Sequence, residues 1–171
     1  MLFSKSNDEM EIPIEQKIIQ AYKMFLKHDR PLLQRGVNER SITHKFAEHL
    51  QREFPDYDVD CEYNKTGLQT KALIGLQNMF KPAPADDKKA TTVFPDIIVH
   101  HRGERKKRKR NNLVVIEAKK NVKTDKRDES KLKLYKMELK YQKAYFLTFP
   151  TGKKANDFTE SQIHGFITEM K

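Results

Sequence analysis

Apolar residues in the first third of the chain recur at the spacing of an α-helix. Between residues 15 and 30 they fall mostly three or four positions apart, which places them on one helical face. Arg30 precedes Pro31, and the residue before a proline avoids helical dihedral angles, so we expect this helix to end there. A second helix with the same spacing is predicted from Asn38, a good N-cap residue, to about Phe54.

Strand patterns follow in the middle of the chain. Residues 57–64 alternate between apolar and polar side chains, which is typical of a half-buried strand. Two apolar runs rich in Val and Ile, residues 93–99 and 113–119, predict buried strands. A short basic segment joins these runs, so an antiparallel hairpin is the simplest way to pair them.

The connection over residues 65–92 is long for a compact domain and indicates an insertion. Within it, we expect a short helix at residues 68–80 and a mobile loop at residues 81–92, which holds two prolines and many charges.

The last third predicts a helix over residues 128–140, a strand over 144–149 and a final helix over 159–170. Either Asp125 or Asp128 can cap the first of these helices. The order of elements indicates one α/β domain over the whole chain, with core order α-β-β-β-α-β from the second helix to the last strand.

The net charge of the chain predicts what kind of partner it binds. The chain of 171 residues has 34 Lys and Arg against 24 Asp and Glu, a net charge of +10. Such an excess favours a polyanionic partner, with nucleic acid ahead of an anionic membrane surface. The single cysteine, Cys61, excludes an internal disulfide and a thiolate zinc cluster. No apolar leader or membrane-length run occurs, so we expect a cytoplasmic protein without a membrane partner.

Charged residues lie at comparable places in the two buried runs. Asp96 lies in the first run, and Glu117 and Lys119 end the second. Because side chains alternate along a strand, Glu117 and Lys119 share a face, and strand pairing could bring Asp96 beside them. Two carboxylates a few ångströms apart repel each other, and a hard divalent cation such as Mg²⁺ relieves that repulsion.

These residues also carry a resemblance. Pro95-Asp96 and, after twenty intervening residues, Glu117-Ala118-Lys119 resemble the signature of the PD-(D/E)xK nuclease superfamily, which has the restriction-endonuclease-like fold. The chain is also similar to an uncharacterised bacterial branch of that superfamily in the stretches Asn38–His44, Val59–Asn64 and Ile97–Gly103. The resemblance covers about residues 38–150 and implies an αβββαβ core with a mixed four-stranded sheet flanked by helices.

The resemblance implies a metal-dependent endonuclease that hydrolyses phosphodiester bonds, with DNA favoured over RNA. Asp96, Glu117 and the backbone carbonyl of Ala118 would hold Mg²⁺, for which Mn²⁺ could substitute. Lys119 would orient or help to deprotonate the attacking water. Glu39 lies on the apolar stripe of the second helix and matches a superfamily acidic residue that reaches the metal; the alternative is an ordinary first-turn glutamate favoured by the helix dipole.

Basic residues supply candidate contacts to a phosphate backbone. The segment from Arg102 to Arg110 holds seven basic residues and one acidic residue. Lys131 is added because the superfamily's helix after the Glu-x-Lys strand flanks the site. The predicted nucleic-acid contacts are His101, Arg102, Arg105, Lys106, Lys107, Arg108, Lys109, Arg110 and Lys131.

Two other interpretations stay open. The chain could bind nucleic acid without cutting it, or Asp96, Glu117 and Lys119 could form a purely structural salt-bridge network. The basic segment could equally be a solvated loop that touches nothing. A homodimer would suit cleavage of both strands of a duplex.

Overall fold

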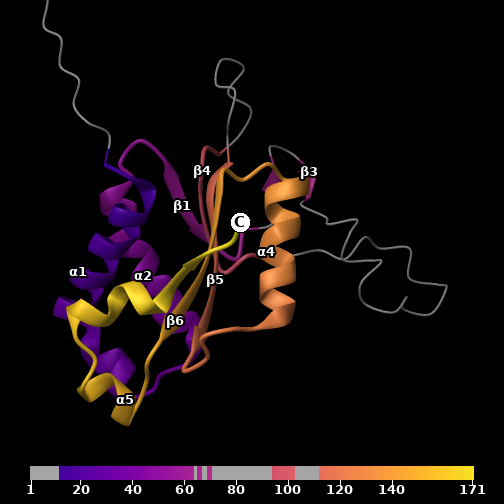
Figure 1. The fold of residues 1–171 in the computed structure, drawn as a ribbon. Coiled ribbons are helices and arrows are strands. Elements are labelled where there is room, and N and C mark those ends of the chain that lie inside the picture. Colours follow the sequence, from indigo (N-terminus) through magenta and orange to yellow (C-terminus); the bar gives the residue numbers. More distant parts are fainter. Residues whose placement is uncertain (1–11, 64, 67–68, 71–93, 103–111) are drawn as a thin grey trace, which may run out of the picture.

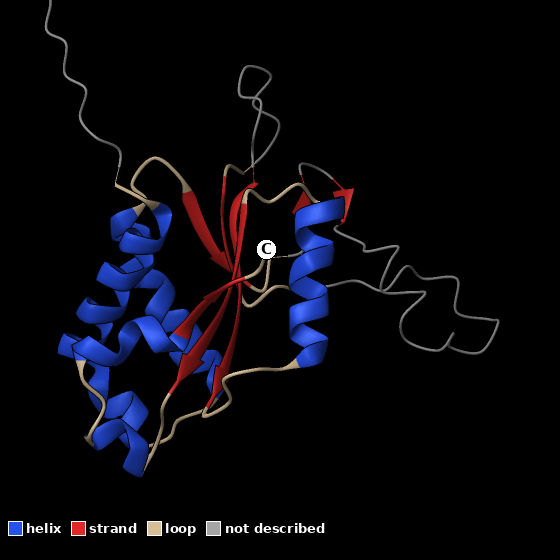
Figure 2. Ribbon diagram, viewed as in Figure 1, coloured by secondary structure: helices blue, strands red, loops and turns tan. Residues whose placement is uncertain are grey.

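A mixed five-stranded sheet separates two helical layers in the computed structural model (Figure 1). The structure describes residues 12–63, 65–66, 69–70, 94–102 and 112–171. In chain order the elements are α1 (Ile14–Gln34), α2 (Glu39–Glu53), β1 (Asp58–Cys61), β2 (Lys65–Thr66), β3 (Gln69–Thr70), β4 (Ile97–His100), β5 (Asn112–Lys120), α4 (Lys126–Glu138), β6 (Lys143–Phe149), α5 (Lys153–Asn156), the 3₁₀ helix η1 (Glu160–Phe166) and β7 (Ile167–Glu169). Figure 2 shows α1 and α2 on one face of the sheet and α4 on the other.

The strands lie in the order β1-β4-β5-β6-β7. β4 is antiparallel to both β1 and β5, so the predicted hairpin is confirmed. β5 and β6 are parallel neighbours, as the helical crossover through α4 requires. The α/β class is thereby confirmed, and α2, β1, β4, β5, α4 and β6 follow one another in the predicted order around a separate β2–β3 pair.

Each face of the sheet has its own core. Val114 and Ile116 of β5 lie in the cluster under α1 and α2, where rings such as Phe25, Phe46 and Phe149 pack edge to face. Val115, one position away, lies in the smaller cluster under α4. The continuous apolar run of β5 is therefore explained by a central strand that is buried on both faces.

The predicted helix over residues 159–170 is wrong in its second half. After the 3₁₀ turn, Ile167 to Glu169 pair antiparallel with β6 and make the fifth strand of a sheet that was expected to have four. Ile167 packs under α1 and α2 while Met170 packs under α4, which a strand allows and a single helix face does not. The open edge of β6 offers unpaired backbone groups, and pairing with them outweighs the local helical spacing.

Helix α1 continues past Arg30 and contains Pro31, contrary to the expected end. A proline inside a helix removes one backbone hydrogen bond. Here the last turn is held by the fully buried Leu33 and by Arg30, whose Nη1 donates to the carbonyls of Ala155 and Phe158 at 3.0 and 2.8 Å. Tertiary contacts thus outweigh the local penalty.

The insertion begins with the short β2–β3 pair, so the helix predicted from residue 68 does not begin there. The rest of that predicted helix and the loop predicted at residues 81–92 lie outside the described residues. In the part of the chain that the structure describes, every helix is too short or too polar to span a bilayer.

Candidate active site

Strand β5 places Glu117 and Lys119 on the face covered by α4. Both are paired with side chains of α4, whereas the intervening Ala118 lies in the core cluster under α1 and α2. The predicted shared face of Glu117 and Lys119 is therefore confirmed. Their neighbours earlier in the strand are fully buried and apolar, so the strand is fixed by packing and holds both charged groups where its apolar run ends.

Asp96 reaches the same place from the start of β4. The ladder between β4 and β5 begins with Ile97 opposite Ile116, and beyond it the Ala118 backbone N–H donates to Asp96 Oδ2 at 2.8 Å. The Asp96 carboxylate thus takes the position of a strand partner. On its other side the Asp96 carbonyl accepts from the Glu62 N–H at 3.3 Å. Burial raises the pKa of Asp96 above its ordinary value, against the Ala118 hydrogen bond and nearby lysines that lower it.

Glu117 is the most deeply buried charged group of the site, with 1% of its surface exposed. Its Oε2 accepts from Lys131 Nζ at 2.8 Å. Its Oε1 is buried and makes no hydrogen bond of ordinary geometry among the described residues. The buried Tyr135 hydroxyl lies close to this carboxylate, whose charge and hydrogen bonding, after burial, raise the pKa of Tyr135. Burial, followed by the charge of Asp96, raises the pKa of Glu117 to about 8. An unpartnered oxygen on a buried acid is costly, so this atom is a candidate position for a ligand.

Helix α4 supplies a residue that the sequence reasoning missed. Asp125, not Asp128, caps this helix, by accepting from the N–H groups of Arg127 and Asp128. The buried Asp128 carboxylate instead lies 2.7 Å from Lys131 Nζ and 3.2 Å from Lys119 Nζ. The signal was present in the sequence, because Asp128 lies four and seven positions before the buried Leu132 and Tyr135 and so shares their stripe.

Glu39 approaches from α2, as predicted. It is the first residue of that helix, and Asn38 caps it by accepting from the Ser41 N–H at 2.7 Å. Glu39 Oε1 lies 3.3 Å from Lys119 Nζ, and its Oε2 accepts from the Lys120 N–H at 3.1 Å. Burial lowers the pKa of Lys119, but the carboxylates of Asp128 and Glu39 more than offset this and hold the ammonium charged.

A cleft of about 400 Å³ opens this cluster on the side of Glu39 and Asp96. Arg40 and Glu62 line it as well and pair with each other at 2.9 Å. The cleft opens Glu39 and Asp96 to solvent, whereas Glu117 lies deeper under α4.

Two carboxylates and one backbone carbonyl of the cluster could hold a divalent cation. The described side chains of the cluster are the carboxylates of Glu39, Asp96, Glu117 and Asp128 and the ammonium groups of Lys119 and Lys131. With all of them ionised, the carboxylates exceed the lysines by two charges. No three His, Cys, Asp or Glu side chains within the described ranges form a ready-made metal group. The fit rests instead on Asp96, on Glu117 Oε1 and on the Ala118 carbonyl, which points to the Asp96 side because a strand residue's N–H and C=O share an edge.

The structure separates two predicted nucleic-acid contacts from this cluster. His101 is buried and stacks on Tyr57, with ring centroids 4.4 Å apart, and Arg102 bonds to Asp58 and Asp60. Both follow the far end of β4, about 16 Å along the strand from Asp96. They contribute to the β1–β4 pairing rather than to the cleft. Lys131 lies within the cluster, and the predicted contacts Arg105, Lys106, Lys107, Arg108, Lys109 and Arg110 lie outside the described residues.

Comparison with protein-family models, with curated proteins and with solved structures finds no match for this chain.

Proposed function

We propose that this chain is a divalent-metal-dependent nuclease that hydrolyses phosphodiester bonds in nucleic acid, with DNA as the favoured substrate. The observation that carries the proposal is the convergence of Asp96, Glu117 and Lys119 at one end of the β4–β5 hairpin, where Glu117 Oε1 is buried without a hydrogen bond. The element order from α2 to β6 supports a restriction-endonuclease-like core, with β7 as an added edge strand.

Asp96, Glu117 and the Ala118 carbonyl would hold Mg²⁺, and Mn²⁺ offers the same preference for oxygen ligands. A bound cation of this kind lowers the pKa of its coordinated water and offsets negative charge on a phosphate. The positive end of Lys119 lies on the same face as Glu117 and is held charged, so it can donate to the attacking water or to a phosphate oxygen. Asp128 and Glu39 fix that ammonium between them.

Glu39 lies on the cleft side of the cluster and, besides holding Lys119, contacts the backbone of β5. Its carboxylate keeps the end of β5 tied to α2 through the Lys120 N–H, so the two elements that form the cleft stay in register. It also adds negative charge beside Asp96, which favours the retention of cations at this end of the cleft.

The test incubates the protein with linear and circular duplex DNA, single-stranded DNA and RNA, each with Mg²⁺, Mn²⁺ or EDTA. We expect cutting with either cation and none with EDTA. Asp96→Asn keeps the side-chain shape and should abolish cutting, while Asp60→Asn, the same change on the neighbouring strand β1, should retain it. The proposal fails if the wild-type chain cuts no substrate, or if Asp96→Asn cuts as fast as the wild type.

A domain that binds nucleic acid without cutting it is the second candidate. One observation favours it: Lys131 pairs with Glu117, and Lys119 pairs with Glu39 and Asp128, so the cluster holds together through ion pairs alone. This candidate predicts retention of DNA that weakens steeply with salt, with no product under any of the cation conditions. A homodimer stays a prediction, which the molar mass in solution would test.

A further inference from the structure

A second cavity lies one strand away from Lys119 of the candidate site. It has a volume of about 360 Å³ and lies where the parallel strands β5 and β6 end. Thr148 lines it and is the register partner of Lys119, so the two side chains stand on the same face of neighbouring strands, about 5 Å apart in the hydrogen-bonding direction. Ligands of open α/β sheets commonly bind beyond the carboxyl ends of the strands.

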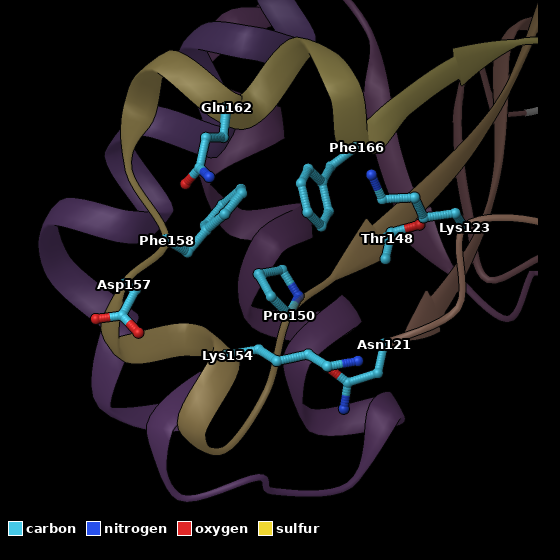
Figure 3. A pocket seen from close by; sticks show the side chains of 9 residues that line it. All are labelled: Asn121, Lys123, Thr148, Pro150, Lys154, Asp157, Phe158, Gln162 and Phe166. Carbon is cyan, nitrogen blue, oxygen red and sulfur yellow. The ribbon is translucent and has the colours of Figure 1, made fainter.

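The wall of this cavity is aromatic. Phe158 and Phe166 meet edge to face, with ring centroids 4.6 Å apart, and Pro150 lies beside them (Figure 3). Phe158 is buried, whereas Phe166 is half-buried and also lines the cavity. The volume falls in the range of about 300–1,000 Å³ that is usual for small-ligand pockets.

The rim on one side is cationic. Lys123 Nζ lies 4.8 Å from the centroid of the Phe166 ring, and Figure 3 shows Lys154 below Pro150, reaching toward Asn121. Both lysines are exposed, so their charges are accessible from solvent. The one carboxylate of the lining, Asp157, lies on the opposite side of the pocket (Figure 3). The backbone under this rim is fixed, because the Asn121 side-chain amide both donates to and accepts from Thr151, at 2.7 and 2.9 Å.

We infer that this pocket binds one unstacked nucleotide of the nucleic-acid strand whose neighbouring phosphate lies at Asp96 and Glu117, an inference that rests on the proposed function. An aromatic wall accepts the flat face of any base, with little dependence on sequence. Two lysines on one rim suit the phosphate attached to that base. The pocket would anchor the strand on one side of the cut and explains how a chain can hold a single strand near the cluster without using Arg102.

Binding measured in EDTA tests the pocket without any chemistry. The probe is a single-stranded 12-mer, and the variant is Lys123→Ala with Lys154→Ala, which removes two exposed charges. The matched control is Lys126→Ala with Lys153→Ala, which removes two exposed lysines that do not line the cavity. We expect about tenfold weaker binding in the pocket pair only, with a salt dependence shallower by about 1.4 in log–log slope. Equal affinities of the two pairs would overturn the inference.

A cross-link locates the base. A 12-mer that carries 5-iodouracil is irradiated on the protein, and the attached peptide is identified by mass spectrometry. We expect attachment at Phe166 or its immediate neighbours; attachment confined to other surfaces would overturn the inference. Binding of deoxyadenosine monophosphate shows whether the pocket prefers a free nucleotide or a nucleotide within a strand. If it binds as tightly as the 12-mer, the ligand is a free nucleotide and the strand proposal is overturned.

The outcome is separable from that of the nuclease proposal. Metal-dependent cutting by the wild type, together with unchanged binding by the pocket pair, would reject the pocket and keep the nuclease. Weakened binding by the pocket pair, together with no cutting under any cation, would keep the pocket and reject the nuclease.

Discussion

Carboxylates with cationic partners lie beside both ends of strand β4: Asp96 and Glu117 at its start, and Asp58 and Asp60 of the neighbouring strand β1 at its end. The two groups differ in how fully their oxygens are hydrogen-bonded. At the end of β4, Asp60 accepts from Arg102 Nε at 2.8 Å and lies 2.8 Å from His100 Nε2. Asp58 accepts from the Arg102 backbone N–H at 2.9 Å. Burial acts to raise the pKa of Asp60, but Arg102 and His100 outweigh it and hold that pKa below its ordinary value.

At the other end the balance is reversed. Glu117 keeps only one of its oxygens hydrogen-bonded within the described part of the chain, and both Glu117 and Asp96 have raised pKa values. Similar residue types thus produce a satisfied network at one end and an unsatisfied one at the other. A satisfied network stabilises the fold, whereas strain that the fold does not relieve is typical of a site that a ligand completes.

The largest expected difference between the two ends is in cutting. Lys119→Met should lower the cutting rate on the order of 10²–10³-fold at saturating Mg²⁺, because it removes a fixed positive charge from the reacting phosphate. Single-turnover cleavage measures this. Arg102→Met is the matched change at the other end and should leave the rate within a few-fold of wild type. Equal losses in both variants would mean that the effect arises from the fold and not from the site.

Without metal, substitutions at the Asp60 end should lower the free energy of unfolding more than substitutions at the Asp96 end. Asp60→Asn removes the charge that Arg102 and His100 bind, and it should lower the free energy of unfolding by about 1–3 kcal/mol. That corresponds to a melting temperature lower by about 2–4 °C per kcal/mol. Asp96→Asn in EDTA should lower the free energy of unfolding only slightly, because burial already disfavours the charged form of the Asp96 carboxylate. Thermal unfolding of both variants decides the point, and a larger loss in Asp96→Asn would contradict it.

The pH dependence should distinguish the ends by its sign. Because the folded pKa of Glu117 is about 8 against an ordinary 4.5, the folded state binds more protons between these values, so stability in EDTA falls as pH rises from about 4.5 to about 8. The slope from this residue is at most about 1.4 kcal/mol per pH unit. Asp60 has a lowered pKa in the folded state, so the stability that it contributes is lost only as the pH falls below 3.8, the ordinary pKa of an aspartate.

Melting curves of wild type and Glu117→Gln from pH 5 to 8.5 measure the Glu117 contribution. The Gln variant should have the shallower slope and be the more stable protein at pH 8. Parallel curves would show that Glu117 is not held in the protonated form.

The smallest effect concerns competition for the Glu117 carboxylate. Lys131→Met removes the ammonium that binds Glu117 Oε2, so Mg²⁺ should bind about fivefold more tightly, equivalent to about 1 kcal/mol. Calorimetric titration with Mg²⁺ measures the affinity. Lys133→Met makes the same change at an exposed position of the same helix and should leave it unchanged. Weaker binding in Lys131→Met would mean that this lysine supports the metal site instead of competing for it.

Local pattern determined the elements that build the site. The Asn38 cap fixed the start of α2 and therefore the place of Glu39, and the alternation of β5 put Glu117 and Lys119 on one face. These are properties of a few consecutive residues, so they can be read without the rest of the chain.

Tertiary structure decided which charges meet and which are satisfied. Asp128, a predicted capping residue, pairs with Lys119 in the cluster, and Arg102 pairs with Asp60. Ile167 to Glu169 form a strand on the open edge of β6. Each of these outcomes depends on groups brought together from distant parts of the chain, and local spacing carries no information about such partners. The unpartnered Glu117 oxygen is of the same kind, because only the packed surroundings determine what a buried atom lacks.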